Sequence, residues 1–204
     1  MQVRDIMAAE VVTIRPDQPA IRAYQLMRDR RFRHLPVVAD DRLIGIVSER
    51  DLRPVLLSPG LAEATVGEIM VESPLTIGPE APVEEAARLL VTRKIGCLPV
   101  VEGDALVGIV TETDLLSVVV ELFGLLRAST RIDVVVPAVE ALQEISRIIR
   151  EEGCEVISMA VLTSPPGVQG RVYTFRLEPC DPHPIVAALT AAGYAVLSHE
   201  AGRR

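Results

Sequence analysis

Hydrophobic and polar residues along the first half of the chain follow one pattern twice. Apolar residues recur every three to four positions over Ala20–Arg30 and over Val83–Arg93, a spacing typical of amphipathic helices. Each helix is preceded by a short extended piece, Val11–Ile14 or Leu75–Ile77, and by a Pro-x-x-Pro segment. Two β-rich runs follow, Leu35–Val38 and Leu43–Val47 in the first copy, parted by a turn at residues 39–42. A further helix is predicted after GIVSERD and after GIVTETD, which gives a β-α-β-β-α unit in each copy.

The two copies match without a gap. Residues 3–52 placed on residues 66–115 agree at 22 of 50 positions, at a constant offset of 63. The matched stretches include HLPVV with CLPVV and DRLIGIVSERDL with DALVGIVTETDL. An internal repeat of this quality fixes the architecture, because each unit leaves an apolar face that the other copy can cover.

The remainder of the chain has a different order of elements. RIDVVVP, CEVISMAVLT, GRVYTFRLEP and YAVLSHE have strand patterns. AVEALQEISRIIREEG and PHPIVAALTAAG have helical patterns, and each ends at a glycine. The order β-α-β-β-α-β predicts a ferredoxin-like domain. We therefore expect three units, at residues 1–62, 63–127 and 128–204.

Composition narrows the range of functions. The net charge of −7 and the pI of about 5.1 provide no basic surface for nucleic acid, so we expect no nucleic-acid partner. There is no run of 18 apolar residues, and the start lacks a signal-peptide pattern, so we expect a cytoplasmic protein without a membrane span. Cys97, Cys154 and Cys180 are odd in number and widely spaced, which favours a reducing compartment and no disulfide framework.

The repeated S-x-x-D and T-x-x-D junctions allow two interpretations. As capping boxes, Ser48 with Asp51 and Thr111 with Asp114 only begin a helix. Alternatively, the unpaired N–H groups of a helix start attract a phosphate, while the carboxylate accepts hydrogen bonds from the two neighbouring hydroxyls of a ribose. A diol, a phosphate and an apolar gap together describe an adenosine nucleotide.

LPVV followed by G-I-V-[ST]-x-x-D in both copies resembles a tandem pair of cystathionine-β-synthase-type (CBS) domains, the Bateman module, over about residues 1–125. The last domain is similar to an ACT domain, and this domain order resembles the acetoin-utilisation protein B family. The resemblance implies an α/β fold in which two repeats dock around a pseudo-two-fold axis. It also implies adenosine ligands (AMP, ADP, ATP, NAD or S-adenosylmethionine), held by the acid of one repeat and the early loop of the other.

Carried onto this chain, the resemblance implies two sites. The Asp114 site comprises Met7, Val12, Phe32, Arg33, His34, Ile109, Thr111 and Asp114. The Asp51 site comprises Ile46, Ser48, Asp51, Met70, Leu75, Ile95, Gly96 and Cys97. Because Arg33 and His34 stand where the second repeat has Gly96 and Cys97, we expect a phosphate-bearing ligand to prefer the Asp114 site.

Catalysis is not predicted. A pyridoxal enzyme needs a Schiff-base lysine, and the one lysine, Lys94, lies inside a repeated structural segment. The sequence contains no G-K-[ST] loop and no G-x-S-x-G elbow, and its histidines lack metal-ligand spacing, so neither a cofactor nor a metal is expected. We therefore expect a homodimeric nucleotide sensor that signals through the helix Leu115–Arg127. A constitutive scaffold without a ligand and an enzyme with a non-standard site are the alternatives.

Overall fold

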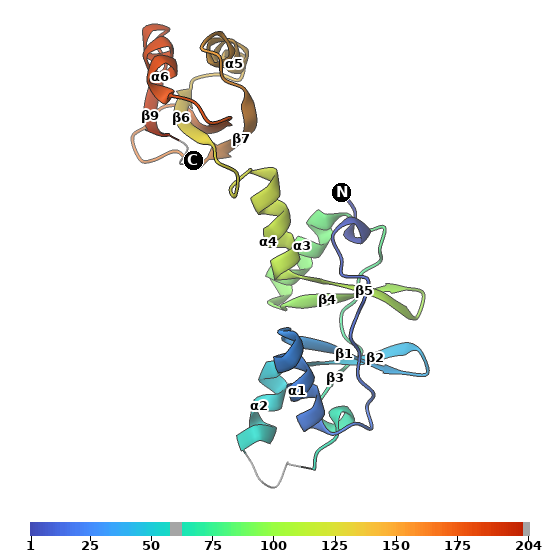
Figure 1. Cartoon of the computed structure of the whole chain (residues 1–204). Helices are drawn as coiled ribbons and strands as arrows, with labels where there is room; N and C mark the ends of the chain where they lie inside the picture. Colours follow the sequence, from blue (N-terminus) through green and yellow to red (C-terminus); the bar gives the residue numbers. More distant parts are fainter. Residues whose placement is uncertain (58–62, 202–204) are drawn as a thin grey trace. The chain divides into compact units, whose positions relative to one another are not determined.

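The computed structural model describes residues 1–57 and 63–201 of the 204-residue chain, and it forms two compact units, residues 1–116 and 117–204 (Figure 1). Within these described ranges, none of the helices has the length and apolar character of a transmembrane span. The predicted domain boundary at 62/63 adjoins residues 58–62, which lie outside the described residues, and the boundary at 127/128 stays a prediction.

The two repeats have matching elements, and the first unit contains them up to Leu116. The first repeat comprises α1 (Ala20–Arg30), β1 (His34–Ala39), β2 (Arg42–Ser48) and α2 (Glu49–Leu57). The second comprises α3 (Val83–Arg93), β4 (Cys97–Glu102), β5 (Ala105–Thr111) and α4 (Glu112–Leu122). The bounds of α1 and α3 are those predicted from the apolar spacing. By contrast, α4 begins three residues before the predicted helix and ends five residues before Arg127.

The N-terminal piece of each repeat packs into the other repeat. The short 3-10 helix η1 (Val3–Asp5) places Val3 in the core of the second repeat, whereas η3 (Val66–Glu68) places Val66 in the core of the first. Both valines are fully buried. Strand β3 (Val71–Glu72) likewise pairs with β2 of the first repeat, and Ala8 forms the equivalent bridge to Ile109. The repeats are therefore joined by an exchange of segments.

The same exchange supplies the helix starts. Neither α1 nor α3 has a side-chain cap, because each follows a proline. The backbone carbonyl of Ala64 instead accepts a hydrogen bond from the N–H of Ala20 at 2.9 Å, and that of Met1 accepts one from the N–H of Val83 at 3.3 Å. For α1 the acceptor lies in the segment that leads into the second repeat, and for α3 it lies in the segment that precedes the first repeat. Each bond satisfies an N–H group that a helix start leaves unpaired.

The strands of the first unit form one antiparallel sheet in the order β1-β2-β5-β4, with β3 added to β2. Each repeat contributes an antiparallel hairpin, and the hairpins meet at the pair Arg42 and Ala105. The segments predicted as strands at 11–14 and 75–77 make only isolated parallel bridges, Ile14 to Val37 and Ile77 to Val100. Prolines close behind both segments end the pairing before a strand can extend.

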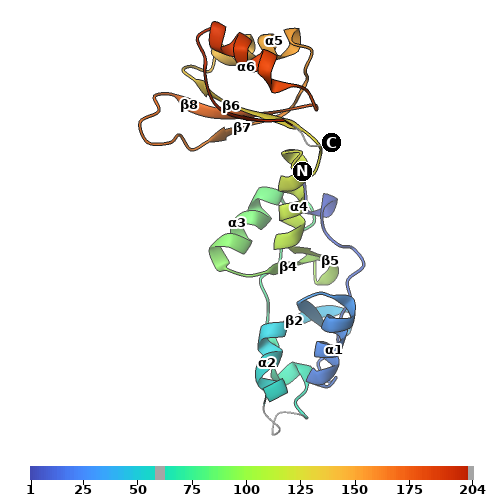
Figure 2. The ribbon, with the colours of Figure 1, turned by 60° about the vertical axis from the view of Figure 1, so that its left-hand side comes forward.

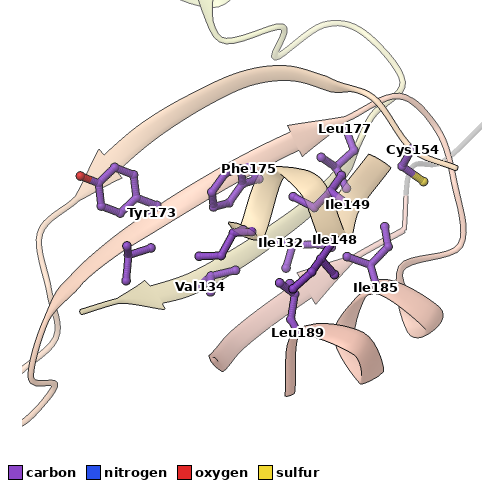
Figure 3. Packing of buried hydrophobic residues seen from close by; sticks show 12 residues of the cluster. Ile132, Val134, Ile148, Ile149, Cys154, Tyr173, Phe175, Leu177, Ile185 and Leu189 are labelled. Atoms are coloured by element: carbon purple, nitrogen blue, oxygen red, sulfur yellow. The ribbon is translucent and has the colours of Figure 1, made fainter. Parts of the chain in front are cut away.

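The second unit has the predicted β-α-β-β-α-β order. Its elements are β6 (Thr130–Val136), α5 (Ala141–Glu151), β7 (Val156–Leu162), β8 (Arg171–Leu177), α6 (Pro182–Ala191) and β9 (Ala195–Glu200). The sheet order β7-β8-β6-β9 is that of a ferredoxin-like fold. Both helices cover one face of the sheet (Figure 2), where Phe175, Ile149 and Leu189 belong to one buried cluster (Figure 3).

The expectation that the chain lacks disulfides is wrong. Cys154 and Cys180 form a disulfide within the second unit, with Cα atoms 6.5 Å apart. Cys154 follows the end of α5 and Cys180 precedes the start of α6, so 26 residues of sequence separate them although the fold brings them together. Spacing along the sequence could not reveal this pair, because the two cysteines approach each other only when the sheet has formed.

Candidate functional site

The repeated hydroxyl–acid junctions form reciprocal capping boxes. Oδ2 of Asp51 accepts hydrogen bonds from the backbone N–H and the hydroxyl of Ser48 at 2.8 and 2.5 Å, and the Asp51 N–H donates to Ser48 Oγ at 3.4 Å. In the second repeat, Oδ2 of Asp114 accepts the corresponding two bonds from Thr111, both at 2.7 Å. The structural interpretation of these motifs is therefore realised in both copies.

The capping bonds use only one oxygen of each carboxylate. Within the described residues, Oδ1 of Asp51 and Oδ1 of Asp114 accept no hydrogen bond, and both residues line a cavity. An ionised carboxylate can accept several hydrogen bonds at its two oxygens. Capping a helix and holding a ligand hydroxyl are therefore compatible tasks for the same side chain.

The Asp114 cavity has a volume of about 360 Å³ and draws its walls from both repeats. Of the eight residues predicted for this site, seven line the cavity: Val12, Phe32, Arg33, His34, Ile109, Thr111 and Asp114. Sequence reasoning missed Ala8, Glu10, Val11, Arg31, Pro36, Gly96 and Thr113. Most of these are immediate neighbours of predicted residues, so proximity along the chain was the available signal.

The Asp51 cavity is larger, with a volume of about 790 Å³. Seven of its eight predicted residues line it: Ile46, Ser48, Asp51, Leu75, Ile95, Gly96 and Cys97. The missed residues are Arg33, His34, Glu49, Arg50, Arg53, Val71, Pro74, Leu90, Val91, Lys94, Pro99 and Glu112. Both volumes fall within the range of roughly 300–1,000 Å³ that is usual for small-molecule sites.

Two predicted residues lie elsewhere. Met7 packs over Gly108 and Met70 packs over Gly45, each on the first residue of a G-I-V segment. A Cβ at either glycine would collide with the thioether of that methionine. The methionines do not line the cavities; they pack against the strand behind the predicted sites, and their positions depend on the missing side chain of each glycine.

The turn before each LPVV strand is built by a residue with left-handed backbone geometry. Arg31 (φ 59°) ends α1 and Lys94 (φ 53°) ends α3. The next N–H then bonds back to the helix, from Phe32 to the Met27 carbonyl at 3.1 Å and from Ile95 to the Leu90 carbonyl at 3.1 Å. This closure, common at helix ends, directs the three residues before Leu-Pro into the cavities.

Positive charge is not confined to the Asp114 site. Arg33 and His34 line both cavities, and Arg50, Arg53 and Lys94 add three cations to the Asp51 cavity. Arg33 and His34, which the sequence analysis assigns to the Asp114 site, therefore line both cavities. The preference of phosphate for the Asp114 site stays a prediction.

Burial changes the proton affinity of two lining groups. It lowers the pKa of His34 below its ordinary value, with a further lowering by Arg33, while Asp51 and Glu112 oppose the shift. Burial also raises the pKa of the Cys97 thiol to about 12. Cys97 is consequently a neutral packing residue rather than a nucleophile.

The arrangement suits the binding of a ligand with hydroxyl and anionic groups. The cavities combine helix starts, free carboxylate oxygens, cationic side chains and apolar walls such as Val12 and Ile109. Among the residues that the structure describes, no group of three or more His, Cys, Asp or Glu side chains is placed to hold a metal ion.

Known proteins share this architecture. The acetoin utilization protein (AcuB) structure from Vibrio cholerae superposes with a TM-score of 0.57 at 34% identity, over 62% of this chain and 95% of that one. CBSX2, a CBS-pair protein from Arabidopsis thaliana, was solved in complex with AMP and superposes with a TM-score of 0.54 at 29% identity, over 59% of this chain and 96% of its own. The CBS domain pair of MJ0100, in complex with 5′-methylthioadenosine and S-adenosyl-L-methionine, gives 0.54 at 26% identity, over 58% and 95%.

Larger proteins contain the same region. Inosine-5′-monophosphate dehydrogenase from Korarchaeum cryptofilum is 37% identical over 106 residues, which are 52% of this chain and 21% of the dehydrogenase. The chain thus spans about a fifth of the length of that relative. The CBS domain family matches at residues 3–58 and 66–121, which contain both cavities' carboxylates. With two matched copies over more than half of its length, the chain belongs to the CBS domain family.

Proposed function

We propose that this chain is a non-catalytic regulatory protein that binds adenosine-containing nucleotides between its two CBS repeats. The observation that carries the proposal is the pair of cavities. Each is lined by the aspartate of a capping box, and the Oδ1 atom of that aspartate accepts no hydrogen bond from the described residues. Each Oδ1 can accept hydrogen bonds from ribose hydroxyls, while the arginines at the cavity walls neutralise phosphate.

The ligands of related proteins support the adenosine part of the proposal. AMP, 5′-methylthioadenosine and S-adenosyl-L-methionine share an adenosine group and differ in what is attached to its 5′ carbon. A site that recognises the common group needs a diol acceptor and a flat apolar gap for the base. In this chain we assign these roles to Asp114 with Val12 and Ile109, and to Asp51 with Ile46 and Leu75, which line the two cavities.

Isothermal titration with AMP tests the proposal through the substitutions Asp51→Asn and Asp114→Asn. Each retains an oxygen for the capping bonds but removes the charge. Hydrogen bonds to charged groups contribute about 1.5–3 kcal/mol, so each variant is expected to lose affinity at its own cavity by roughly 10- to 150-fold. NAD, ADP, ATP and S-adenosylmethionine tested in the same way rank the possible ligands.

The chain offers a matched control for the capping role. Glu68 accepts hydrogen bonds from the backbone N–H and hydroxyl of Thr65 at 2.7 and 2.9 Å, in the same geometry, but it lines neither cavity. Glu68→Gln is therefore expected to leave AMP affinity unchanged. If Glu68→Gln weakens AMP binding as much as Asp114→Asn does, the aspartates act only through fold stability.

A constitutive scaffold is the competing function. It is favoured by the capping bonds themselves, which account for both junctions as helix starts. A scaffold predicts no heat and no shift in melting temperature with any of the five nucleotides or cofactors, whereas the sensor predicts both for at least one.

Signal transmission and assembly complete the proposal. Exposed apolar side chains recur on one helix at Leu116, Val119 and Leu122, a spacing that places them on one face of α4. We propose that a second copy of the chain packs against this face. We take the ferredoxin-like domain as ACT-like and propose that it transmits nucleotide occupancy. We place this activity in the cytoplasm. Sedimentation equilibrium of the wild type and of Leu116→Glu with Leu122→Glu tests the dimer: the wild type should sediment as a dimer and the variant as a monomer.

A further inference from the structure

Three residues among those described line both cavities: Arg33, His34 and Gly96. At the repeat offset of 63, Arg33 corresponds to Gly96 and His34 corresponds to Cys97. These matched positions lie where the two repeats meet, and they carry different residues on the two sides. The wall between the cavities is therefore asymmetric, and of these three shared residues His34 is the one whose side-chain type has an ordinary pKa near neutral pH.

The imidazole of His34 reaches this position because the facing residue has no side chain. A Cβ built on Gly96 would lie 2.7 Å from Cε1 and 3.0 Å from Nε2 of the ring. Real Cβ atoms do not approach so closely, so any larger residue at position 96 would displace the ring. Pairing of His34 with Ser48 across β1 and β2 holds the backbone of the histidine beside the Asp51 capping box.

Charged groups from the flanking residue and from two helices act on the ring. Arg33 lies next to it in sequence, Arg50 and Asp51 come from α2, and Glu112 comes from the start of α4. The ring is half-buried, and burial together with the two arginines keeps it largely uncharged at neutral pH. An added negative charge in either cavity would shift this balance towards the imidazolium.

Resting on the proposed function, we propose that His34 couples the two cavities: a phosphate entering either one causes the imidazole to take up a proton, and the imidazolium then stabilises a second phosphate in the other. The proton comes from solvent, and no covalent bond changes. Arg33 also lines both cavities, so on this shared wall its one guanidinium faces two phosphates, in addition to the cations that line a single cavity. Proton uptake at His34 adds a second positive charge to the residues that the two cavities share.

Proton linkage sets the size of the effect. Uptake of a full proton makes affinity rise tenfold for each unit of falling pH, and partial uptake gives a proportionally smaller slope. We expect AMP affinity to rise between pH 8 and pH 6 more steeply in the wild type than in His34→Gln. Protonation of the AMP phosphate contributes equally to both proteins and cancels in the comparison.

Two measurements on the full chain test the coupling. The first is the NMR titration of the imidazole Cε1 protons with and without AMP; the chain has three histidines, and His34→Gln assigns the signal of interest. The second is calorimetry of AMP binding in PIPES and in imidazole buffer, whose different ionisation enthalpies reveal proton uptake. His199→Gln, which alters a residue outside both cavities, is the matched control.

The expected result is a higher His34 pKa in the AMP complex and a proton uptake that is lost in His34→Gln but kept in His199→Gln. Binding of AMP without a change at His34, and with equal proton uptake in both variants, overturns the coupling while leaving nucleotide binding intact. Absence of any AMP binding overturns the proposed function as well. If His34→Gln fails to fold, the His34 signal can be assigned by elimination with His183→Gln and His199→Gln, and the NMR titration of the wild type still decides the question.

Discussion

The exchange of N-terminal segments makes a specific prediction about stability. Val3 is fully buried in the core of the second repeat, although it precedes the first repeat in sequence. Val3→Ala removes two methyl groups, each worth about 0.8 kcal/mol, and leaves a small cavity, so a loss of about 2 kcal/mol is expected. Val66→Ala should cost a similar amount in the first repeat, because Val66 is equally buried there.

Native-state hydrogen exchange locates these losses. A loss of about 2 kcal/mol corresponds to about a 30-fold increase in the local opening equilibrium. Val3→Ala should increase exchange mainly in β4 and β5, and Val66→Ala mainly in β1 and β2. If Val3→Ala instead loosens β1 and β2 selectively, the N-terminal segment does not pack into the second repeat. In that case residues 8–12 would not line the Asp114 cavity.

Four further predictions concern individual groups. Unfolded protein without reductant should show one thiol, that of Cys97, and three after reduction of the Cys154–Cys180 disulfide, as counted with Ellman's reagent; three thiols before reduction would contradict the disulfide. In the folded protein at pH 8, Cys97 should react far more slowly than in urea, because its pKa is raised to about 12. The pKa of His34 is lower in the folded than in the unfolded chain. Its contribution to folding stability is therefore present above about pH 6.5 and is lost as pH falls through the pKa of the folded state. Urea unfolding midpoints measured from about pH 8 to pH 5 should consequently fall less in His34→Gln than in the wild type. Phe175→Ala should destabilise the ferredoxin-like domain by about 3–5 kcal/mol, measured by its thermal transition, and an unchanged transition would contradict its place in the core.

Much of the fold could be predicted because the repeat carries its own pattern. The apolar spacing gave the bounds of α1 and α3, and LPVV with G-I-V gave the hairpins. The exchange of η1 and η3 could not be predicted in this way, because a three-residue turn has no periodicity and its partner lies in a distant segment. The disulfide was missed for a related reason, since only the packed sheet brings Cys154 and Cys180 together.

The candidate sites were predicted where the motif names the residues. Asp51, Asp114 and their hydroxyl partners line the cavities as expected. The sharing of Arg33 and His34 between both cavities was not predicted, because sequence offset assigns each residue to one site. The shared wall arises from the absence of a side chain at Gly96, and the distance from Gly96 to the ring is visible only in three dimensions.

The most direct test of nucleotide recognition is a crystal structure of the chain grown with millimolar AMP. The account predicts a nucleotide in at least one cavity, with its ribose hydroxyls donating to Asp114 or Asp51 and its base between apolar strand residues. Cavities filled instead by the chain's own side chains, with both aspartates bonded only to Thr111 and Ser48, would contradict it.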